Sequence, residues 1–504
     1  MASPKLYTTI HALKNKIEVP LGLFIDGEFR RGGGAAFHTI NPENEQPVVA
    51  DTVQAASKAD VDAAVSAARL AYNTTWGQTV EGSERSRLMR KLADLIDRDT
   101  CLLAAVEALD GGKTVTWCEG DIADASACLR YYAGWADKIH GQTLEGHAPT
   151  KMSFTLHEPV GVVGQIVPFN YPLMMAGWAI APALAVGCSV VFKPAEATPL
   201  STLLLAQLVH EAGFPKGVFN VVNGSGRETG AAIAEHPDID KVSFTGSTAT
   251  GRGIAVAAAR SNLKKVSLEL GGKSPSLVFP SADIDEAVKW SAFGVFENAG
   301  QSCSAGTRLL VHESVYEQFV TKLAHAADAI KLGSVLDRST QQGPQIHRAQ
   351  FEKVMQYIDI GKAEGARVVA GGTRYGDTGL FIRPTVFADV HNGMRIAQEE
   401  IFGPVVVVIP FKNEDEAVEM ANDTSYGLAA AIHSKQADEV GRVMHHLKAG
   451  TVWVNQYTML SHNTPFGGYK QSGWGRQLGS YGLDAYMNVK GVSWNYGPEA
   501  APKL

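Results

Sequence analysis

Cysteine is scarce in this sequence and follows no recognisable spacing. The 504 residues contain five cysteines, at positions 101, 118, 128, 188 and 303, without a Cys-x-x-Cys pair or histidine-rich spacing. This distribution argues against a zinc site and against a disulfide framework. We therefore predict no metal site, and we expect the chain to fold in a reducing compartment.

A strong excess of one charge and long apolar runs are also lacking. Charged residues make up 19% of the chain and the formal net charge is -7, so no basic face for nucleic acid is implied. No apolar run approaches the ~18 residues that span a bilayer, and residues 1–7 lack the apolar core of a signal peptide. We expect a cytoplasmic protein with no nucleic-acid or membrane partner. The ending Pro502-Lys-Leu504 resembles the peroxisomal Ser-Lys-Leu address except at its first residue, so peroxisomal import is the alternative.

The pattern of apolar residues predicts an α/β fold. An Asp-Gly pair within residues 22–30 predicts a hairpin, and residues 59–72 and 84–98 have the three- and four-residue apolar spacing of helices that cover a sheet. Short β-branched runs then alternate with helical stretches, which indicates a parallel, doubly wound sheet with ligands beyond the carboxyl ends of its strands. The predicted strands are residues 161–167, 189–192, 218–222, 241–244 and 265–268, with helices at 200–212 and 226–235.

A second alternating set begins near residue 274 and contains Cys303. We interpret it as a catalytic domain facing the first, with the boundary near Gly271-Gly272. A chain of this length accommodates roughly three domains of about 150 residues each. The strands predicted in the second set are residues 274–279, 307–312, 405–410 and 451–455.

Cys303 lies among small residues in the stretch 297–308, Glu-Asn-Ala-Gly-Gln-Ser-Cys-Ser-Ala-Gly-Thr-Arg. A helix-like run over residues 283–298 precedes it and a β-rich run follows it, so we expect the cysteine on the connecting loop. Small neighbours leave room for a substrate to reach the sulfur. On spacing alone, a nucleophile and a buried structural cysteine are equally compatible with this stretch.

Two stretches after strand ends carry groups that suit a nucleotide. Residues 244–251, Phe-Thr-Gly-Ser-Thr-Ala-Thr-Gly, present backbone N–H groups and a helix N-terminus to a phosphate, and an ordinary tight turn is the alternative. Lys193 and Glu196 are placed to hydrogen-bond ribose hydroxyls, and a carboxylate there would repel the 2′-phosphate of NADP and so favour NAD. A solvated surface pair is the alternative for these two residues.

Two polar side chains near strand ends are candidates for acid–base and oxyanion chemistry. Glu269 stands at a strand end beside two glycines, where partial desolvation would make it a general base, and a salt-bridge partner is the alternative. Asn170 is held between Pro168 and Pro172, and a rigid side-chain amide is a good oxyanion donor. Taken alone, an asparagine between prolines indicates only a turn.

Taken together, these stretches resemble the NAD(P)-dependent aldehyde dehydrogenase superfamily over nearly the whole chain, most closely the cytosolic and mitochondrial class that acts on acetaldehyde and retinal. Several motifs occur in the family's order, which leaves little room for coincidence. They are residues 168–172 (Pro-Phe-Asn-Tyr-Pro), 193–196 (Lys-Pro-Ala-Glu), 244–247 (Phe-Thr-Gly-Ser), 269–273 (Glu-Leu-Gly-Gly-Lys), 300–303 (Gly-Gln-Ser-Cys), 399–404 (Glu-Glu-Ile-Phe-Gly-Pro) and 465–470 (Pro-Phe-Gly-Gly-Tyr-Lys).

The resemblance implies a role for each motif. It makes Cys303 the nucleophile, Glu269 the general base and Asn170 the oxyanion donor, and it makes NAD the cofactor. The residues implied to contact the cofactor are Ile166, Val167, Pro168, Phe169, Lys193, Glu196, Gly226, Gly246, Ser247, Gln350, Lys353, Glu400 and Phe402. Those implied to line an apolar substrate tunnel are Tyr171, Met175, Trp178 and Phe466, with Ser302 beside the nucleophile.

The mechanism implied by the resemblance begins with attack of the Cys303 thiolate on the aldehyde carbon. The Asn170 amide and the backbone N–H of Cys303 hold the oxyanion, and loss of hydride to the nicotinamide gives a thioester. Glu269 then activates the water that releases the acid. A free thiol with a pKa near ~8.5 is only slightly ionised at neutral pH, so the site must lower that pKa or supply a base.

The resemblance also implies a domain division and an oligomer. Residues 1–140 and 160–270 would form a Rossmann-like NAD-binding domain, residues 271–480 an α/β catalytic domain, and residues 141–159 and 481–504 strands that bridge the subunits of a homotetramer or homodimer. The expected partner is a small aliphatic or aromatic aldehyde, because aromatic walls offer no cation for a carboxylated one.

Two rival functions remain open. A catalytically silent relative kept as a structural or binding protein is disfavoured because Cys303, Glu269 and Asn170 are all retained. A CoA-acylating or phosphorylating relative is disfavoured by Glu269, whose implied task is to activate water.

Overall fold

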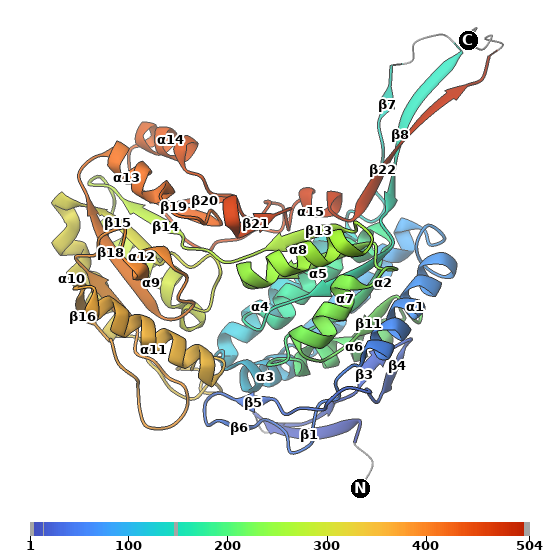
Figure 1. The fold of residues 1–504 in the computed structure, drawn as a ribbon, viewed down its shortest axis with the longest axis horizontal. Helices are drawn as coiled ribbons and strands as arrows, with labels where there is room; N and C mark the ends of the chain where they lie inside the picture. Colours follow the sequence, from blue (N-terminus) through green and yellow to red (C-terminus); the bar gives the residue numbers. More distant parts are fainter. Residues whose placement is uncertain (1–4, 14, 146–149, 498–504) are drawn as a thin grey trace.

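The computed structural model describes residues 5–13, 15–145 and 150–497 and is built on two large sheets, one in each of two lobes (Figure 1). The first sheet has the order β21-β13-β12-β9-β10-β11-β3-β4, and its five central strands are parallel. All five central strands were predicted, and they confirm the doubly wound fold. The strands are β3 (Leu23–Ile25), β4 (Glu28–Arg30), β9 (Val162–Ile166), β10 (Ser189–Lys193), β11 (Phe219–Val221), β12 (Lys241–Thr245), β13 (Lys265–Glu269) and β21 (Gly473–Trp474).

Successive residues of the central strands point into different cores on the two faces of this sheet. Val162 and Val191 join the core formed with α1 (Lys58–Thr74), α7 (Ala231–Glu235) and α8 (Thr248–Ser261). Val163 and Val190 join the larger core on the other face, formed with α5 (Pro172–Val186) and α6 (Leu200–Ala212). Helices on both faces therefore hold the strand ends rigidly in place.

The predicted helices at 59–72 and 84–98 are present, but the second has a different neighbour. It is α2 (Gly82–Arg98), and it packs on α4 (Val115–Ala133), α5 and α6, with α3 (Thr100–Gly111) completing the layer, so the prediction that it covers a sheet is wrong. The reason is α5, whose residues are apolar or small on every side and nearly all buried. A helix that is apolar all round needs cover on both sides, and α2 and α4 provide it on the side away from the sheet.

The second sheet has the order β16-β17-β18-β15-β14-β19-β20 and includes all four predicted strands. Three of its strands, β16, β17 and β19 (Ala429–His433), were not predicted from the sequence. One of them, β19, begins with three alanines, which carry no strand preference. Its strands are β14 (Pro275–Val278), β15 (Arg308–His312), β16 (Arg367–Ala370), β17 (Thr385–Ala388), β18 (Val405–Phe411), β19 and β20 (Thr451–Val454). Its helices are α9 (Ile284–Phe296), α10 (Tyr316–Asp328), α11 (Arg348–Ala363), α12 (Arg395–Gln398), α13 (Glu414–Asn422) and α14 (Ala437–His446).

The chain crosses between the lobes more often than predicted. It leaves the first sheet after β13 and enters the second at β14, so the boundary near Gly271-Gly272 agrees with the strands. It then returns, because β21 pairs antiparallel with β13, and the prediction that the catalytic domain runs unbroken from 271 to 480 is wrong at its end. A two-residue strand has too little periodicity to be recognised, but it covers what would otherwise be an open sheet edge.

A long three-stranded sheet projects from the first lobe (Figure 1). It has the order β22-β8-β7, formed by β7 (Thr143–Leu144), β8 (Lys151–Pro159) and β22 (Met487–Asn495), and the short helix α15 (Tyr481–Asp484) precedes its last strand. The two segments predicted to bridge subunits therefore pair with each other in one arm. The ending Pro502–Leu504, on which the peroxisomal alternative rests, lies outside the described residues.

Three antiparallel hairpins complete the described N-terminal part. The one predicted from an Asp-Gly pair is β3 with β4, and Asp26 and Gly27 at its turn have φ of 55° and 77°, as a two-residue hairpin turn requires. The others are β1 (Tyr7–Ala12) with β2 (Asn15–Pro20), and β5 (Ile40–Asn41) with β6 (Gln46–Pro47). Among the described residues, no helix is both long and apolar enough to cross a membrane.

Candidate active site

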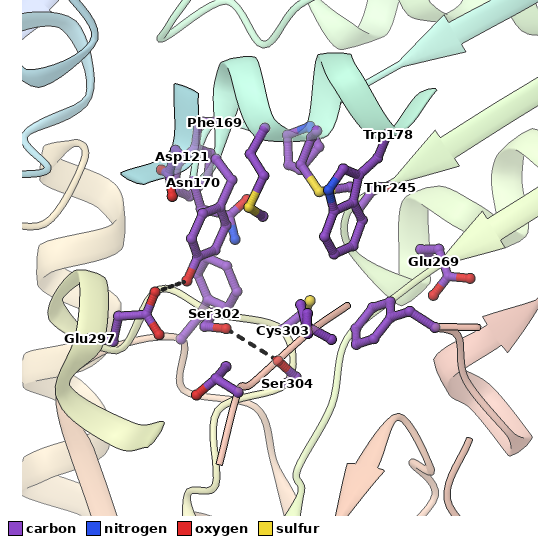
Figure 2. A pocket seen from close by; sticks show the side chains of 18 of the residues that line it. Asp121, Phe169, Asn170, Trp178, Thr245, Glu269, Glu297, Ser302, Cys303 and Ser304 are labelled. Atoms are coloured by element: carbon purple, nitrogen blue, oxygen red, sulfur yellow. Dashed lines mark hydrogen bonds between the residues drawn. The ribbon is translucent and has the colours of Figure 1, made fainter. Parts of the chain in front are cut away.

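The predicted nucleophile, Cys303, lies in the wall of a cavity of about 550 Å³ that residues of both lobes line. Figure 2 shows the side chains of Asn170, Trp178 and Glu269 arranged around Cys303. The cavity therefore brings together motifs that lie far apart in the sequence. The predicted site residues that line it are Pro168, Phe169, Asn170, Tyr171, Met175, Trp178, Gly246, Ser247, Glu269, Ser302, Cys303, Gln350, Lys353, Glu400, Phe402 and Phe466.

Five predicted cofactor residues do not line this cavity. Ile166 ends β9 and Val167 follows it, with their side chains in the two cores of the first lobe, so only their backbone is available to a ligand. Lys193, Glu196 and Gly226 lie further along the carboxyl edge of the same sheet, after β10 and β11.

Cys303 lies on the loop between a short 3₁₀ turn, η2 (Glu297–Gly300), and β15. Burial raises the pKa of its thiol to about 12, with further contributions from the charges of Glu400 and Glu269, while backbone N–H groups act in the opposite direction. The protein alone therefore keeps the thiol protonated at neutral pH.

Glu269 is the last residue of β13 and is buried at the cavity wall. Among the described residues, its Oε2 atom has no hydrogen-bond partner, and Gly467 lies so close that a Cβ atom there would be 2.7 Å from its Oε1. Burial raises the pKa of this carboxyl well above its usual range, and Arg476 offsets only part of that effect. A desolvated carboxylate without partners is a strong proton acceptor, which is the property that a general base requires.

Asn170 lies between β9 and α5, and its backbone and side chain both bind the loop that carries Cys303. Its Nδ2 donates to the Gln301 carbonyl over 2.8 Å, while Asn298 Nδ2 donates to the Asn170 carbonyl over 2.9 Å. The first bond fixes the orientation of the Asn170 amide and leaves its second N–H hydrogen free of that bond. The two bonds clamp the predicted oxyanion donor to the nucleophile loop.

The loop itself adopts an unusual conformation just before Cys303. Asn298, Ala299 and Gly300 all have positive φ, of 49°, 53° and 71°. Two of the three carry a side chain, so the turn stores conformational strain that the surrounding contacts must offset. Asn298 was not predicted as a site residue, although asparagine tolerates the left-handed conformation better than most residues.

The carboxyl ends of β10 and β12 present groups that fit a dinucleotide. Ser247 caps α8 by accepting from Thr250 N over 3.2 Å, so Gly246 and Ser247 direct a helix N-terminus toward the cavity. The buried Lys193 donates to the carbonyl of Pro194 over 3.0 Å and lies 3.5 Å from Glu196, which is more than half exposed. A helix end suited to a phosphate and a cation–carboxylate pair suited to ribose hydroxyls thus lie at the ends of two strands of one sheet, on either side of β9.

The predicted nicotinamide end lies on the second lobe. Glu400 is half-buried and accepts a hydrogen bond from Gly272 N over 3.0 Å. Gln350 was predicted to contact ribose, but its Nε2 donates to the carbonyls of Ile401 and Phe402. Its amide nitrogen thus holds the backbone of Phe402, whose φ of 61° is strained for an aromatic residue.

The predicted substrate wall is aromatic, with carboxyl groups that the sequence did not indicate. Trp178 and Phe466 pack edge to face, with ring centroids 5.7 Å apart. Tyr171 donates through its hydroxyl to Glu297 over 3.1 Å, the bond drawn in Figure 2. Burial raises the pKa of Glu297 to about 7, which reduces its charge near neutral pH.

The remaining features of the wall lie on either side of Tyr171. Ser302 Oγ lies 3.4 Å from Ser304 Oγ. The Lys113 ammonium lies 3.5 Å from the centre of the Tyr171 ring and pairs with Asp121. Asp121, Asp124 and Glu297 also line the cavity and were missed because nothing in their local sequence marks them.

Comparison with known proteins gives a consistent result. The model described as "Aldehyde dehydrogenase family" matches residues 29–492. An aldehyde dehydrogenase of Emericella nidulans is 55% identical over 98% of this chain and 98% of its own length, and aldehyde dehydrogenase 1A1 of Gallus gallus is 50% identical over 94% and 92%.

Solved structures agree with these relatives. The NAD+ complex of aldehyde dehydrogenase from Bacillus cereus superposes with a TM-score of 0.92 at 49% identity and covers 95% of this chain and 97% of its own. Betaine aldehyde dehydrogenase from Staphylococcus aureus, in complex with NAD+, superposes with a TM-score of 0.94 at 41% identity and covers 96% and 97%.

Proposed function

The chain belongs to the aldehyde dehydrogenase family, and from this premise we propose that Cys303, Glu269 and Asn170 carry out its reaction. The enzyme oxidises aldehydes to carboxylic acids with NAD+ and water. One observation supports the assignment above all: a thiol, a desolvated carboxyl group and a fixed amide donor meet at a single cavity.

In the proposed mechanism, the Cys303 thiol releases its proton to solvent, and the thiolate attacks the aldehyde carbon to form a thiohemiacetal. The free N–H of the Asn170 amide and the backbone N–H of Cys303 stabilise the oxyanion, and each such donor typically contributes about 10²–10³ in rate. NAD+, when bound, supplies the acceptor for the hydride that leaves this carbon. The product of that step on the protein is a thioester at Cys303.

Glu269 acts in the second half of the reaction. Its raised pKa makes the ionised carboxylate a strong base toward water. It removes a proton from the water that attacks the thioester carbon, and the acid leaves as the Cys303 thiol is released. Use of water as the acceptor distinguishes this mechanism from that of a CoA-acylating or phosphorylating relative.

A rapid-mixing experiment with Glu269→Gln separates the two halves of the reaction. We expect a burst of NADH close to one per active site with hexanal, followed by very slow turnover, because acylation survives and deacylation stalls. Cys303→Ala should give no burst while still binding NAD+, and the buried Cys128→Ala serves as the matched cysteine control. A missing burst in Glu269→Gln would show that this residue also activates the thiol, and acyl-CoA formed in preference to acid would refute the assignment of water as the acceptor.

We propose further that the enzyme is a homodimer or homotetramer of the cytoplasm. The projecting arm supports the first point, because Leu156, Val489 and Trp494 expose large apolar side chains on it. The five unpaired cysteines support a reducing compartment. Analytical ultracentrifugation tests the oligomer, and a fluorescent fusion that preserves the C-terminus distinguishes cytoplasm from peroxisome.

A further inference from the structure

One carboxylate, that of Asp124, joins three walls of the substrate cavity. Asp124 lies on α4, and its Oδ2 accepts a hydrogen bond from the indole N–H of Trp178 on α5 over 2.6 Å. Its Oδ1 accepts from His462 Nε2 over 3.0 Å, a contact between residues separated by 338 positions. His462 ends residues 458–462, which we call the roof segment because Thr458, Met459 and Leu460 line the cavity.

The roof segment has strained geometry and is held from different sides. Thr458 has a φ of 55°, which is costly for a β-branched residue and persists only where surrounding contacts enforce it. Trp453 donates to the Met459 carbonyl over 2.9 Å, and Gly479 N donates to the His462 carbonyl over 2.7 Å. Both bonds come from the C-terminal part of the chain, whereas Asp124 ties the segment to α4.

Trp178 depends on the same carboxylate for its orientation. Its side chain is buried, and the indole N–H is directed at Asp124 Oδ2 while the ring packs edge to face on Phe466. A buried N–H that lost this acceptor would remain unsatisfied, which is unfavourable. The ring would then turn to find another partner and so change the shape of the cavity wall.

From this arrangement we propose that Asp124 is a positioning residue that determines substrate selectivity by fixing the width of the tunnel. It holds Trp178 in one orientation and the roof segment close to α4, which favours slender unbranched aldehydes over bulky aromatic ones. The inference rests on the proposed function, since it concerns the same cavity. Asp124 itself need not touch the substrate.

The experiment compares kcat/KM for acetaldehyde, hexanal and benzaldehyde in a small set of variants. In Asp124→Ala, we expect the ratio of benzaldehyde to hexanal to rise at least about fivefold, mainly through KM, since a fit that differs by one methylene changes selectivity by about tenfold or more. Asp124→Asn retains an acceptor for the indole and a polar partner for His462, so it should restore the ratio toward that of the native enzyme. Glu119→Ala is the matched control, because Glu119 lies on α4 and pairs with Arg338 outside the cavity lining.

His462→Ala provides a second test if Asp124→Ala folds poorly, because His462 is partly exposed. This variant removes the bond between the roof segment and Asp124 but leaves the bond from Trp178 to Asp124. The ratio of kcat/KM for benzaldehyde to that for hexanal should therefore rise by a smaller factor. An unchanged ratio in both alanine variants, with all three substrates slowed equally, would overturn the proposal. A selective loss of a cationic aldehyde such as 4-aminobutanal in Asp124→Asn would also overturn it, by showing direct charge recognition. Absence of turnover in the native enzyme would instead refute the proposed function.

Discussion

Replacement of Asn298 by glycine should slow catalysis by acting through Asn170. Glycine adopts the φ of 49° found at position 298 without strain, so the change removes the side chain but keeps the turn. The Asn170 carbonyl then loses the bond from Asn298 Nδ2 at 2.9 Å. An unpaired buried carbonyl costs about 1–3 kcal/mol, and the Asn170 segment will move to reduce that cost.

The catalytic effect follows from the value of an oxyanion donor. Complete loss of such a donor costs about 10²–10³ in rate, so partial misplacement of Asn170 should lower kcat/KM by about 10- to 100-fold. Alkylation of Cys303 by iodoacetamide builds no oxyanion and should stay near the native rate. Asn455→Gly is the matched control, since Asn455 also has positive φ, of 53°, and makes two side-chain bonds, both to Ser434.

A double-mutant cycle of Asn298→Gly with Asn170→Ala tests whether Asn298 acts through Asn170. If Asn298 acts only through Asn170, its replacement should have little further effect on kcat/KM once the Asn170 amide is gone. Losses that multiply in the double variant would refute the reasoning, as would a parallel fall in thiol alkylation. Thermal unfolding of all variants, with Asn455→Gly as the reference, accounts for the effect of general destabilisation.

Three further predictions concern the thiol, the loop and the cofactor. Burial raises the pKa of Cys303 to about 12, so the rate of alkylation without NAD+ should still be rising at pH 10, and a plateau below pH 9 would contradict this. Gly300→Ala should lower the free energy of unfolding, measured with a chemical denaturant, by more than about 4 kcal/mol. Gly300 has a φ of +71°, and a Cβ atom there would lie 2.0 Å from the Gly403 carbonyl oxygen. Gly253→Ala is the control and should be tolerated, because a Cβ atom at this position of α8 meets no atom within 4 Å. Glu196→Gln should reduce the kcat/KM preference for NAD+ over NADP+ by about tenfold, since like charges in a site cost on the order of a few kcal/mol, and an unchanged ratio would exclude the carboxylate as its cause.

The motif residues could be predicted because each lies within a short stretch of sequence, and several such stretches in one order resemble a known family. Cys303 is surrounded by small residues, Glu269 stands beside two glycines and Asn170 lies between prolines. The central strands of the first sheet could also be predicted, since β-branched runs of four or five residues between helices fit few other structures. The packing partner of α2 could not be predicted, because the apolar pattern of a helix shows which face is buried but not which element covers that face.

The sequence by itself predicted the doubly wound fold from its periodicity, and its motifs, through their resemblance to a family, indicated the candidates for nucleophile, base and oxyanion donor. Only the tertiary structure decided the protonated state of the Cys303 thiol, since burial and the charges of Glu400 and Glu269 converge on it from separate elements. It alone also placed Asp124 against His462, from 338 residues away. A hydrogen bond or a desolvation cost is a property of distance in space, and that distance exists only once the chain has folded.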